Sequence, residues 1–296
     1  EERFRQLVES TSDWIWEMDK NGKYRYASPQ VEPILGYKPE EVLGRTPFEM
    51  MPCVEAEKMK ATLEALINSG QPINQLQNVN EHKDGHQVVL ESSARPFFDD
   101  EGVIQGYRGV DRDVTERKRM EEKLRHLATH DSLTGLHNRK VFQERIQDEL
   151  ERSERYGHPL AMFMLDIDLF KQVNDSYGHA AGDDVLRAFS VVLKETVRKT
   201  DFVARYGGEE FTALLPETSL EEAAVFAERL REAIAEYPFE LKNGRKLQIK
   251  TSIGVACYPI HADDWLGLLN AADKALYFAK WSGRNRVETV PESRRG

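Results

Sequence analysis

The chain has 296 residues, of which 40% are hydrophobic and 31% charged, and its formal net charge is −10. This composition indicates a soluble globular protein of about two domains and excludes a disordered chain. The acidic balance argues against nucleic acid as a partner, because binding to its backbone depends on clustered Lys and Arg. An acidic site can still bind a nucleotide through Mg²⁺.

The two cysteines, Cys53 and Cys257, are too few for a disulfide framework and predict a reducing, cytoplasmic setting. Each is expected to be a small buried apolar residue. No run of residues approaches the ~18–20 apolar positions of a membrane helix, and no signal peptide is visible. The chain begins Glu1-Glu2-Arg3 without a Met, so we expect any membrane anchor to lie in a segment absent from this chain.

Residues 1–113 predict an α+β domain with an antiparallel sheet, because strand patterns come before and after a group of helical ones. Asn21-Gly22 is the clearest hairpin signal, since both residues tolerate positive φ. The expected elements are strands at 13–19 and 24–26, helices at 31–35, 40–43 and 54–68, and three further strands joined by turns at 83–85 and 99–102.

Residues 114–130 are highly charged and predict a helix. Met120, Leu124 and Leu127 are spaced four and then three apart, which is the pattern of a coiled-coil seam of about one to two heptads. The alternative is a single amphipathic helix packed on its own domain.

Residues 131–296 alternate between strand and helix patterns and predict a central sheet surrounded by helices. The expected elements are helices at 139–155, 182–198, 220–236 and 265–280, and strands at 160–165, 202–206, 211–215 and 251–256.

Two carboxylate clusters follow predicted strands in this part. Asp166 and Asp168 end an apolar strand, and residues i and i+2 of a strand share a face, so both are expected to point into the crevice beyond the strand end. Glu209 and Glu210 follow Gly207-Gly208 at the tip of a predicted hairpin. Two glycines there permit positive φ and the close approach of a ligand.

If the two strands are neighbours, these carboxylates repel one another unless a cation joins them. All-oxygen donors suit Mg²⁺, and two Mg²⁺ ions in one active site drive an in-line displacement at phosphorus, with Mn²⁺ as an alternative. Considered as acid pairs alone, the clusters are equally well explained as solvated acidic turns.

The residues after the first cluster have the chemistry of a nucleotide site. Lys171 is a point charge suited to phosphate. Asn174 and Asp183 offer an amide and a carboxylate, which fit the edge of guanine. The stretch 182–184 is expected to open a helix, whose N-terminus favours anions. The structural alternatives are a helix cap for Asp183 and a turn position for His179.

Four ordered motifs within residues 127–290 resemble the GGDEF family of diguanylate cyclases. They are an opening motif at 130–139, the stretch 166–175, the signature at 205–211 and a closing motif at Lys280 and 283–285. Glu209 stands where the signature has Asp. The resemblance implies a palm-like α/β domain that condenses two GTP into cyclic di-GMP and two pyrophosphates.

The resemblance also implies roles for individual residues. Asp166, Glu209 and the Ile167 carbonyl would hold Mg²⁺, and Glu210 would share this work. Glu209 is the candidate base for the ribose 3′-hydroxyl, and which glutamate does what stays open. The other implied GTP contacts are Lys171, Lys280 and Arg284 to phosphates, Asn174 and Asp183 to guanine, His179 to the nucleotide, and Phe170, Gly207 and Gly208 around the pocket.

Arg198 and Asp201 resemble the family's Arg-x-x-Asp site for inhibitory cyclic di-GMP, with Arg229 on the next helix as a second expected contact. Arg suits this role because it pairs bidentately with phosphate or guanine. The structural alternative is a helix-terminal Arg beside the macrodipole and a strand-capping Asp. The family's catalytic unit is a pair of domains that each hold one GTP, so a homodimer is implied.

Residues 1–113 resemble a PAS sensor domain. The resemblance is carried by the strand 14–19, the stretch 34–37, the hairpin 83–85, and the stretch 109–115 with its Asp-x-Thr element leading to an output helix. The sequence leaves the ligand open: it has no Asn-Cys-Arg motif of flavin-binding light sensors, and His82 and His86 flank a hairpin without resembling haem ligands. Three aromatic residues are either pocket or core residues: Trp14, Trp16 and Tyr26.

We therefore interpret the chain as a dimeric, Mg²⁺-dependent diguanylate cyclase at 131–296. Its product inhibits it, and the sensor domain at 1–113 regulates it through the linker at 114–130. The alternatives are a non-catalytic cyclic di-GMP receptor that signals to a partner protein and a PAS scaffold with a silent cyclase fold. The metal-binding set argues against a pure receptor.

Overall fold

The computed structural model describes residues 10–290, apart from the side chains of residues 64 and 66–69. The chain divides into two compact units, Glu1–Leu124 and Arg125–Gly296. The outer ends of the two predicted domains, residues 1–9 and 291–296, lie outside the described residues. Among the helices described, none combines the length and the apolar character needed to cross a bilayer.

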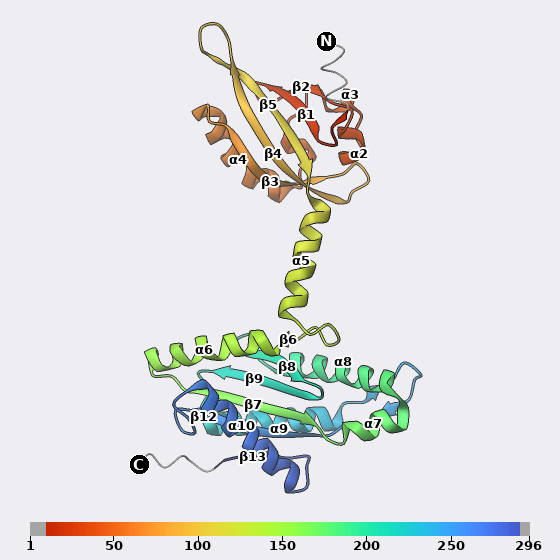
Figure 1. Cartoon of the computed structure of the whole chain (residues 1–296), viewed down its shortest axis with the longest axis vertical. Helices are drawn as coiled ribbons and strands as arrows, with labels where there is room; N and C mark the ends of the chain where they lie inside the picture. The colour runs from red at the N-terminus through yellow and green to blue at the C-terminus, as the bar shows by residue number, and fades with distance from the viewer. Residues whose placement is uncertain (1–9, 291–296) are drawn as a thin grey trace. The chain divides into compact units, whose positions relative to one another are not determined.

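The first unit is built on a five-stranded antiparallel sheet in the order β2-β1-β5-β4-β3 (Figure 1). Its strands are β1 (Trp14–Asp19), β2 (Tyr24–Ala27), β3 (Ile73–Glu81), β4 (Gln87–Phe98) and β5 (Ile104–Asp113). In β1, Trp14, Trp16 and Met18 are buried, whereas Ile15 and Glu17 between them are half-buried. The alternation in the sequence therefore decides which face of the strand meets the core.

Helices between β2 and β3 complete the first unit. They are α2 (Val31–Leu35), α3 (Pro39–Val42), the 3₁₀ helix η1 (Pro47–Met50) and α4 (Cys53–Ser69). Val31, Leu35 and Val42 pack in the same core as the tryptophans of β1. The antiparallel sheet with flanking helices confirms the α+β prediction. Cys53 is exposed, contrary to expectation, because it begins α4 outside the apolar face, whereas Cys257 in the second unit is buried as predicted.

Helix α5 (Thr115–Thr129) follows β5 directly. The Asp113 carboxylate accepts a hydrogen bond from the Thr115 amide at 2.8 Å, and the Thr115 hydroxyl oxygen accepts one from the Val89 amide at 2.9 Å. Arg117 adds an ion pair to Glu91 at 2.9 Å. The Asp-x-Thr element thus ties the start of the helix to β4.

The second unit contains a six-stranded sheet in the order β13-β12-β7-β9-β8-β6. Its strands are β6 (His137–Asn138), β7 (Leu160–Ile167), β8 (Phe202–Gly207), β9 (Glu210–Pro216), β12 (Thr251–Tyr258) and β13 (Val287–Thr289), and β10 (Phe239–Glu240) pairs with β11 (Lys246–Leu247) separately. The four central strands, β12, β7, β9 and β8, run antiparallel to one another, and the outer pairs β12–β13 and β6–β8 are parallel.

Helices cover both faces of this sheet (Figure 1). They are α6 (Arg139–Tyr156), α7 (Phe170–Tyr177), α8 (His179–Thr196), α9 (Leu220–Glu236) and α10 (Trp265–Trp281). From β7, Phe163 and Leu165 join the core beneath α8 and α9, while Met162 and Met164 join the core beneath α6 and α10. Burial on both faces explains why β7 is apolar throughout, and the predicted sheet surrounded by helices is confirmed.

The structure differs from the sequence prediction between β7 and α8. Helix α7 was not predicted, and α8 begins at His179 rather than at residue 182. Gly178, with φ 85°, ends α7 and precedes the first residue of α8. Gly182 and Asp183 therefore lie inside α8, and Asp183 is not its N-cap.

Candidate functional site

The two carboxylate clusters lie on neighbouring strands. In the register of β7 and β9, Asp166 is directly opposite Glu210. The Ile167 amide donates a hydrogen bond to the Glu209 carbonyl at 3.3 Å, so the pairing continues to the tip of the β8–β9 hairpin. Asp166 is only 6% exposed, while both glutamates are half-buried.

Asp166 carries a strongly perturbed carboxyl group. Burial raises its pKa to about 6, against the effect of Lys280, whose Nζ lies 2.7 Å from Asp166 Oδ2. The charges of Glu209 and Glu210 raise this pKa further. Lys280, predicted to contact phosphate, is thus an ion-pair partner of the buried aspartate.

These residues fit a hard divalent cation by the chemistry of their donors. The carboxylates of Asp166, Glu209 and Glu210 supply oxygen only, and each of the glutamates opposes the ionisation of Asp166, which a bound cation would reverse. Within the described part of the chain, the three carboxylates do not all approach within 4.8 Å of one another. A cation bound here would draw them together.

A single arginine fixes the hairpin that carries the glutamates. Arg205 donates from Nε and Nη2 to the Gly208 carbonyl at 2.9 and 2.7 Å, and from Nη1 to Asp131 at 3.0 Å. Asp131 also accepts hydrogen bonds from the amide and hydroxyl of Thr134. Burial raises the pKa of Asp131, but these hydrogen bonds outweigh it and lower the pKa. The opening motif is therefore joined to the signature hairpin.

The two glycines at the hairpin tip differ in conformation. Gly208 has φ 49°, whereas Gly207 does not have a positive φ. A Cβ atom on either would meet no atom within 4 Å. The space in front of the tip is therefore open, as a site approached by a ligand requires.

The predicted guanine-binding residues lie where α7 meets α8. A Cβ atom on Gly182 would lie 2.0 Å from Asn174 Oδ1 and 3.1 Å from the ring of buried Phe170. Only a glycine at position 182 leaves room for the Asn174 side chain against α8. Asn174 therefore lies beside the residue that precedes Asp183 in the chain. Asp183 itself has a distant ion pair with Arg187, at 4.0 Å.

Lys171 and His179 are exposed, as is Arg284 at the closing motif. Lys171 and Asn174 are three residues apart on α7 and therefore share one side of that helix. The structure thus presents a lysine and an amide together, although the sequence analysis did not predict the helix that does so.

Asp168 is engaged differently from Asp166. Its carboxylate accepts hydrogen bonds from the Ser252 hydroxyl at 2.7 Å and from the Asn285 amide at 2.9 Å. Arg284 and Asn285 both have positive φ, a conformation that costs energy in non-glycine residues. Asp168 therefore holds the turn that presents Arg284, and each of its two oxygens already accepts a hydrogen bond.

The Arg-x-x-Asp segment forms a closed turn after α8. The Asp201 carboxylate accepts a hydrogen bond from the Arg198 amide at 2.8 Å, and burial raises the Asp201 pKa. The Arg198 side chain is exposed and contributes to lowering the pKa of Glu222 at the start of α9. Arg229 on α9 is also exposed and stacks over Phe226, 4.8 Å from the ring centre.

The first unit contains a small, partly open cavity of about 30 Å³, which is room for about two water molecules. Its polar wall includes Asn78, Ser92 and Asp111, all at least nine-tenths buried, and Asn78 donates to Ser92 at 2.9 Å. Trp16 lines the cavity, whereas Tyr26 is 45% exposed and is not part of its wall. Trp14 is a core residue.

Comparison with known families decides what this arrangement is. The family model described as "Diguanylate cyclase, GGDEF domain" matches residues 128–286, and the model of the PAS fold matches residues 8–119. The chain belongs to the GGDEF family of diguanylate cyclases. Both resemblances noted from the sequence are confirmed, and a PAS fold precedes the GGDEF domain.

Curated relatives match through the GGDEF part of the chain. Response regulator PleD of Caulobacter vibrioides is 41% identical over 180 residues, which are 58% of this chain and 40% of the relative. Diguanylate cyclase DgcP of Pseudomonas aeruginosa is 45% identical over 169 residues, 57% of this chain and 25% of the relative. The chain therefore spans less than half the length of these relatives.

Solved GGDEF structures resemble the second unit. The coiled coil and GGDEF domain of DgcB from Caulobacter crescentus, in complex with cyclic di-GMP, is 32% identical with a TM-score of 0.55, covering 60% of this chain and 93% of that one. Diguanylate cyclase SiaD of Pseudomonas aeruginosa, in complex with its activator SiaC, is 36% identical with a TM-score of 0.53, covering 59% and 66%.

Proposed function

We propose that this GGDEF chain is a Mg²⁺-dependent diguanylate cyclase that condenses two GTP into cyclic di-GMP and two pyrophosphates. The observation that carries the proposal is the placement of Asp166 opposite Glu210, beside Glu209 and Lys280, on the strand that leads into Asn174 and α8. A metal set and a guanine-binding set on one stretch of chain are what such an enzyme needs.

In this proposal Asp166, Glu209, Glu210 and the Ile167 carbonyl hold Mg²⁺, which would neutralise charge on the reacting phosphates. Glu209 accepts the proton of the ribose 3′-hydroxyl, and the freed oxygen attacks the α-phosphorus of the other GTP, with loss of pyrophosphate. We leave open whether Glu210 shares the role of base.

The remaining residues bind and orient GTP. Lys171, Lys280 and Arg284 are cations for the phosphates, and Lys280 is already beside Asp166. Asn174 and Asp183 would read guanine, with His179 against the nucleotide.

Each active site would be completed by a second copy of the chain. Met120, Leu124 and Leu127 form an exposed apolar stripe on α5, being 61%, 66% and 51% exposed. A stripe at this spacing supports a parallel pairing of two α5 helices, which would bring together two GGDEF domains, each with one GTP. Because Asp113 and Thr115 tie α5 to β4, a change in the PAS domain would bear on that pairing.

Product inhibition would act through Arg198 and Asp201. The Asp201 carboxylate shapes the turn and leaves the Arg198 guanidinium exposed for a phosphate or guanine of cyclic di-GMP. Arg229 is a further exposed cation on the next helix.

The test is the products formed from GTP and Mg²⁺ by the full chain, first stripped of bound cyclic di-GMP. We expect a cyclic di-GMP peak that grows and then stalls. Glu209→Gln is expected to abolish turnover and retain GTP binding, whereas Glu195→Gln, on an exposed part of α8, is expected to behave as the wild type. Full activity of Glu209→Gln would refute the proposed base and metal ligand. No product, combined with tight cyclic di-GMP binding, would favour the receptor interpretation.

A further inference from the structure

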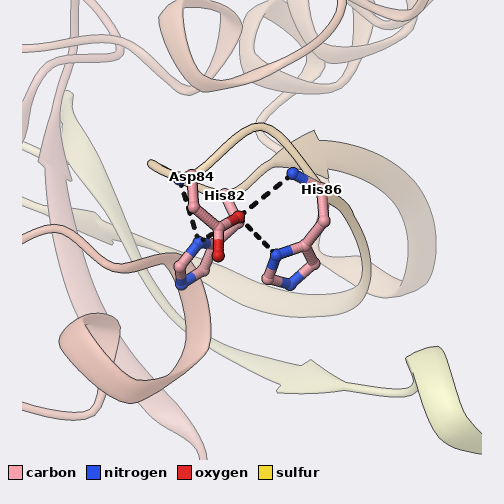
Figure 2. A group of neighbouring side chains, drawn as sticks. All are labelled: His82, Asp84 and His86. Carbon is pink, nitrogen blue, oxygen red and sulfur yellow. Dashed lines mark hydrogen bonds and ion pairs between the residues drawn. The ribbon is translucent and has the colours of Figure 1, made fainter.

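The hairpin between β3 and β4 of the first unit gathers two histidines and an aspartate, far along the chain from the GGDEF residues (Figure 2). The His82 amide donates to the His86 carbonyl at 2.8 Å, and the Gly85 amide donates to the His82 carbonyl at 2.7 Å. This tight turn places His82 and His86 across from each other, with their rings stacked 4.3 Å apart. Asp84 lies between them in the turn.

Three metal-binding atoms converge at this hairpin. Nδ1 of His82 lies 2.9 Å from Asp84 Oδ1, and Nδ1 of His86 lies 2.5 Å from the same oxygen. Each ring therefore turns the same nitrogen toward one carboxylate oxygen (Figure 2). In the described part of the chain, this is the group of His, Cys, Asp or Glu side chains whose ligand atoms all lie within 4.8 Å of one another.

The contacts of His82 Nδ1 are compatible with a cation beside it. Its Nδ1 accepts a hydrogen bond from the Asp84 amide at 3.2 Å and also faces the Asp84 carboxylate at 2.9 Å. An imidazole nitrogen that accepts a hydrogen bond presents a lone pair, and a lone pair repels a carboxylate oxygen. A proton on Nδ1 would remove this conflict through a hydrogen bond to the carboxylate, and a metal ion between the nitrogen and the oxygen would remove it by taking both as ligands.

The hairpin is held against the rest of the first unit. A Cβ atom on Gly36 would lie 2.7 Å from both Cε1 and Nε2 of His82, so the glycine makes room for this ring. The Lys83 amide donates to the Leu35 carbonyl at 2.9 Å, and Lys83 Nζ contacts Glu41 at 2.7 Å. His82 is consequently the fixed ligand of the group.

The other two side chains have room to adjust. The Asp84 and His86 side chains are 64% and 51% exposed, against 19% for His82. Ligands 2.0–2.1 Å from a tetrahedral Zn²⁺ are separated by roughly 3.3 Å. The present separations of 2.5 and 2.9 Å reach that value by less than about 1 Å of movement, which rotation of exposed side chains supplies.

We propose that His82, Asp84 and His86 form a binding site for a divalent transition-metal ion, with Zn²⁺ as the natural occupant and water completing its coordination. Two imidazoles and one carboxylate are a donor set for Zn²⁺ and its neighbours in the first transition row, and they disfavour Mg²⁺ and Ca²⁺, which take oxygen ligands. The ion would tie together the two sides of the hairpin. It would stabilise the first unit to the extent that it binds the folded chain more tightly than the unfolded chain.

The test is calorimetric titration of the full chain with Zn²⁺ in excess Mg²⁺, so that the GGDEF carboxylates are occupied by Mg²⁺. We expect one Zn²⁺ per chain at this site. His86→Gln and Asp84→Asn should each weaken it by no less than the roughly 10–100-fold that loss of an outer-shell partner costs. Both residues are exposed, so neither change threatens folding.

Two control variants separate this site from other histidines. His158→Gln changes an exposed histidine after α6, and His130→Gln changes the middle ring of a stack with His126 and His137, whose ring centres are 4.2 and 4.4 Å apart. Both should bind Zn²⁺ as the wild type does. The proposal is overturned if the wild type binds no Zn²⁺ in excess Mg²⁺, or if His86→Gln and Asp84→Asn bind it unchanged. Loss of binding in His130→Gln alone would overturn it as well.

Discussion

Asp166 and Asp168 are two residues apart in the chain and yet have different surroundings. Asp166 faces Lys280 and two glutamates, and burial raises its pKa to about 6. Asp168 accepts two hydrogen bonds and holds a turn with two positive φ values. At the scale of the residue, one carboxylate is available for chemistry and the other maintains the structure.

We expect Asp168→Asn to lower the free energy of unfolding of the second unit by about 1–3 kcal/mol, because an amide presents a donor toward the Ser252 hydroxyl or the Asn285 amide. Asp166→Asn should cost less stability and abolish turnover, since the Lys280 side chain is 34% exposed and reaches water. Urea unfolding and cyclic di-GMP formation measure the two effects. Equal destabilisation by the two variants would contradict this division of roles.

Asp111 makes the stability of the first unit depend on pH. Burial raises its pKa from 3.8 to about 6, with Ser92 and Trp16 opposing the shift in part. Between those values the folded chain binds more protons than the unfolded chain, so the free energy of unfolding falls as pH rises from about 4 to about 6. Above pH 6 the Asp111 carboxylate is charged in the folded chain, and the full free-energy cost of burying that charge is present.

We therefore expect Asp111→Asn to stabilise the first unit at pH 7 by at most about 3 kcal/mol, the free-energy equivalent of the difference between 3.8 and about 6. At pH 3.5 the variant and the wild type should be nearly equal. Denaturant unfolding followed over this pH range measures the effect. The prediction would be contradicted if the difference in the free energy of unfolding between Asp111→Asn and the wild type stayed the same from pH 4 to pH 6.

At the scale of the element, the sequence predicts the helices and strands whose ends and apolar spacing depend on neighbouring residues alone. Helix α9 was predicted at 220–236 and has those bounds, because Ser219 and Glu222 form a capping box ahead of an amphipathic run. Helix α7 was not predicted, because its eight residues make only about two turns, which is too short for an apolar pattern to distinguish a helix from a loop. The start of α8 depends on the φ of Gly178, which the sequence does not reveal.

The sequence also predicted part of the candidate site, namely its residues, but not all the contacts between them. The sequence analysis placed the two clusters together only on the condition that the two strands are neighbours, and the structure meets that condition with Asp166 opposite Glu210. The junction of Arg205 with Asp131 and Gly208 was missed, because it joins residues 74 positions apart through side-chain atoms. Two features of the sequence could have indicated this junction: Arg205 stands two residues before Gly207, and Asp131 is the second residue of the opening motif.

At the scale of the whole molecule, the chain joins a PAS fold to a GGDEF domain through one helix. The proposed reaction needs two such chains, and α5 offers the exposed Met120, Leu124 and Leu127. The opposite side of the same helix is charged, with Glu122 about 160° around the axis from Leu124. The helix therefore has an exposed apolar side and a charged side.

We expect Leu124→Glu to shift the chain toward the monomer and to reduce cyclic di-GMP formation together, because a charge within the stripe opposes helix pairing. Glu122→Gln on the opposite side should change neither. Sedimentation equilibrium and product formation at matched protein concentrations measure both quantities. A monomer that keeps full activity per chain would refute the dimeric active site.

The contacts of Arg205 with Asp131 and Gly208 also link helix α5 to the signature hairpin. Helix α5 ends at Thr129, two residues before Asp131. The Asp131 carboxylate accepts a hydrogen bond from the Arg205 guanidinium, which also donates to the carbonyl of Gly208, the residue before Glu209. The end of the helix and the candidate base Glu209 are thus connected through two side chains, those of Asp131 and Arg205. In the proposed regulation, a movement of α5 would therefore reach the β8–β9 hairpin through the contact between Asp131 and Arg205.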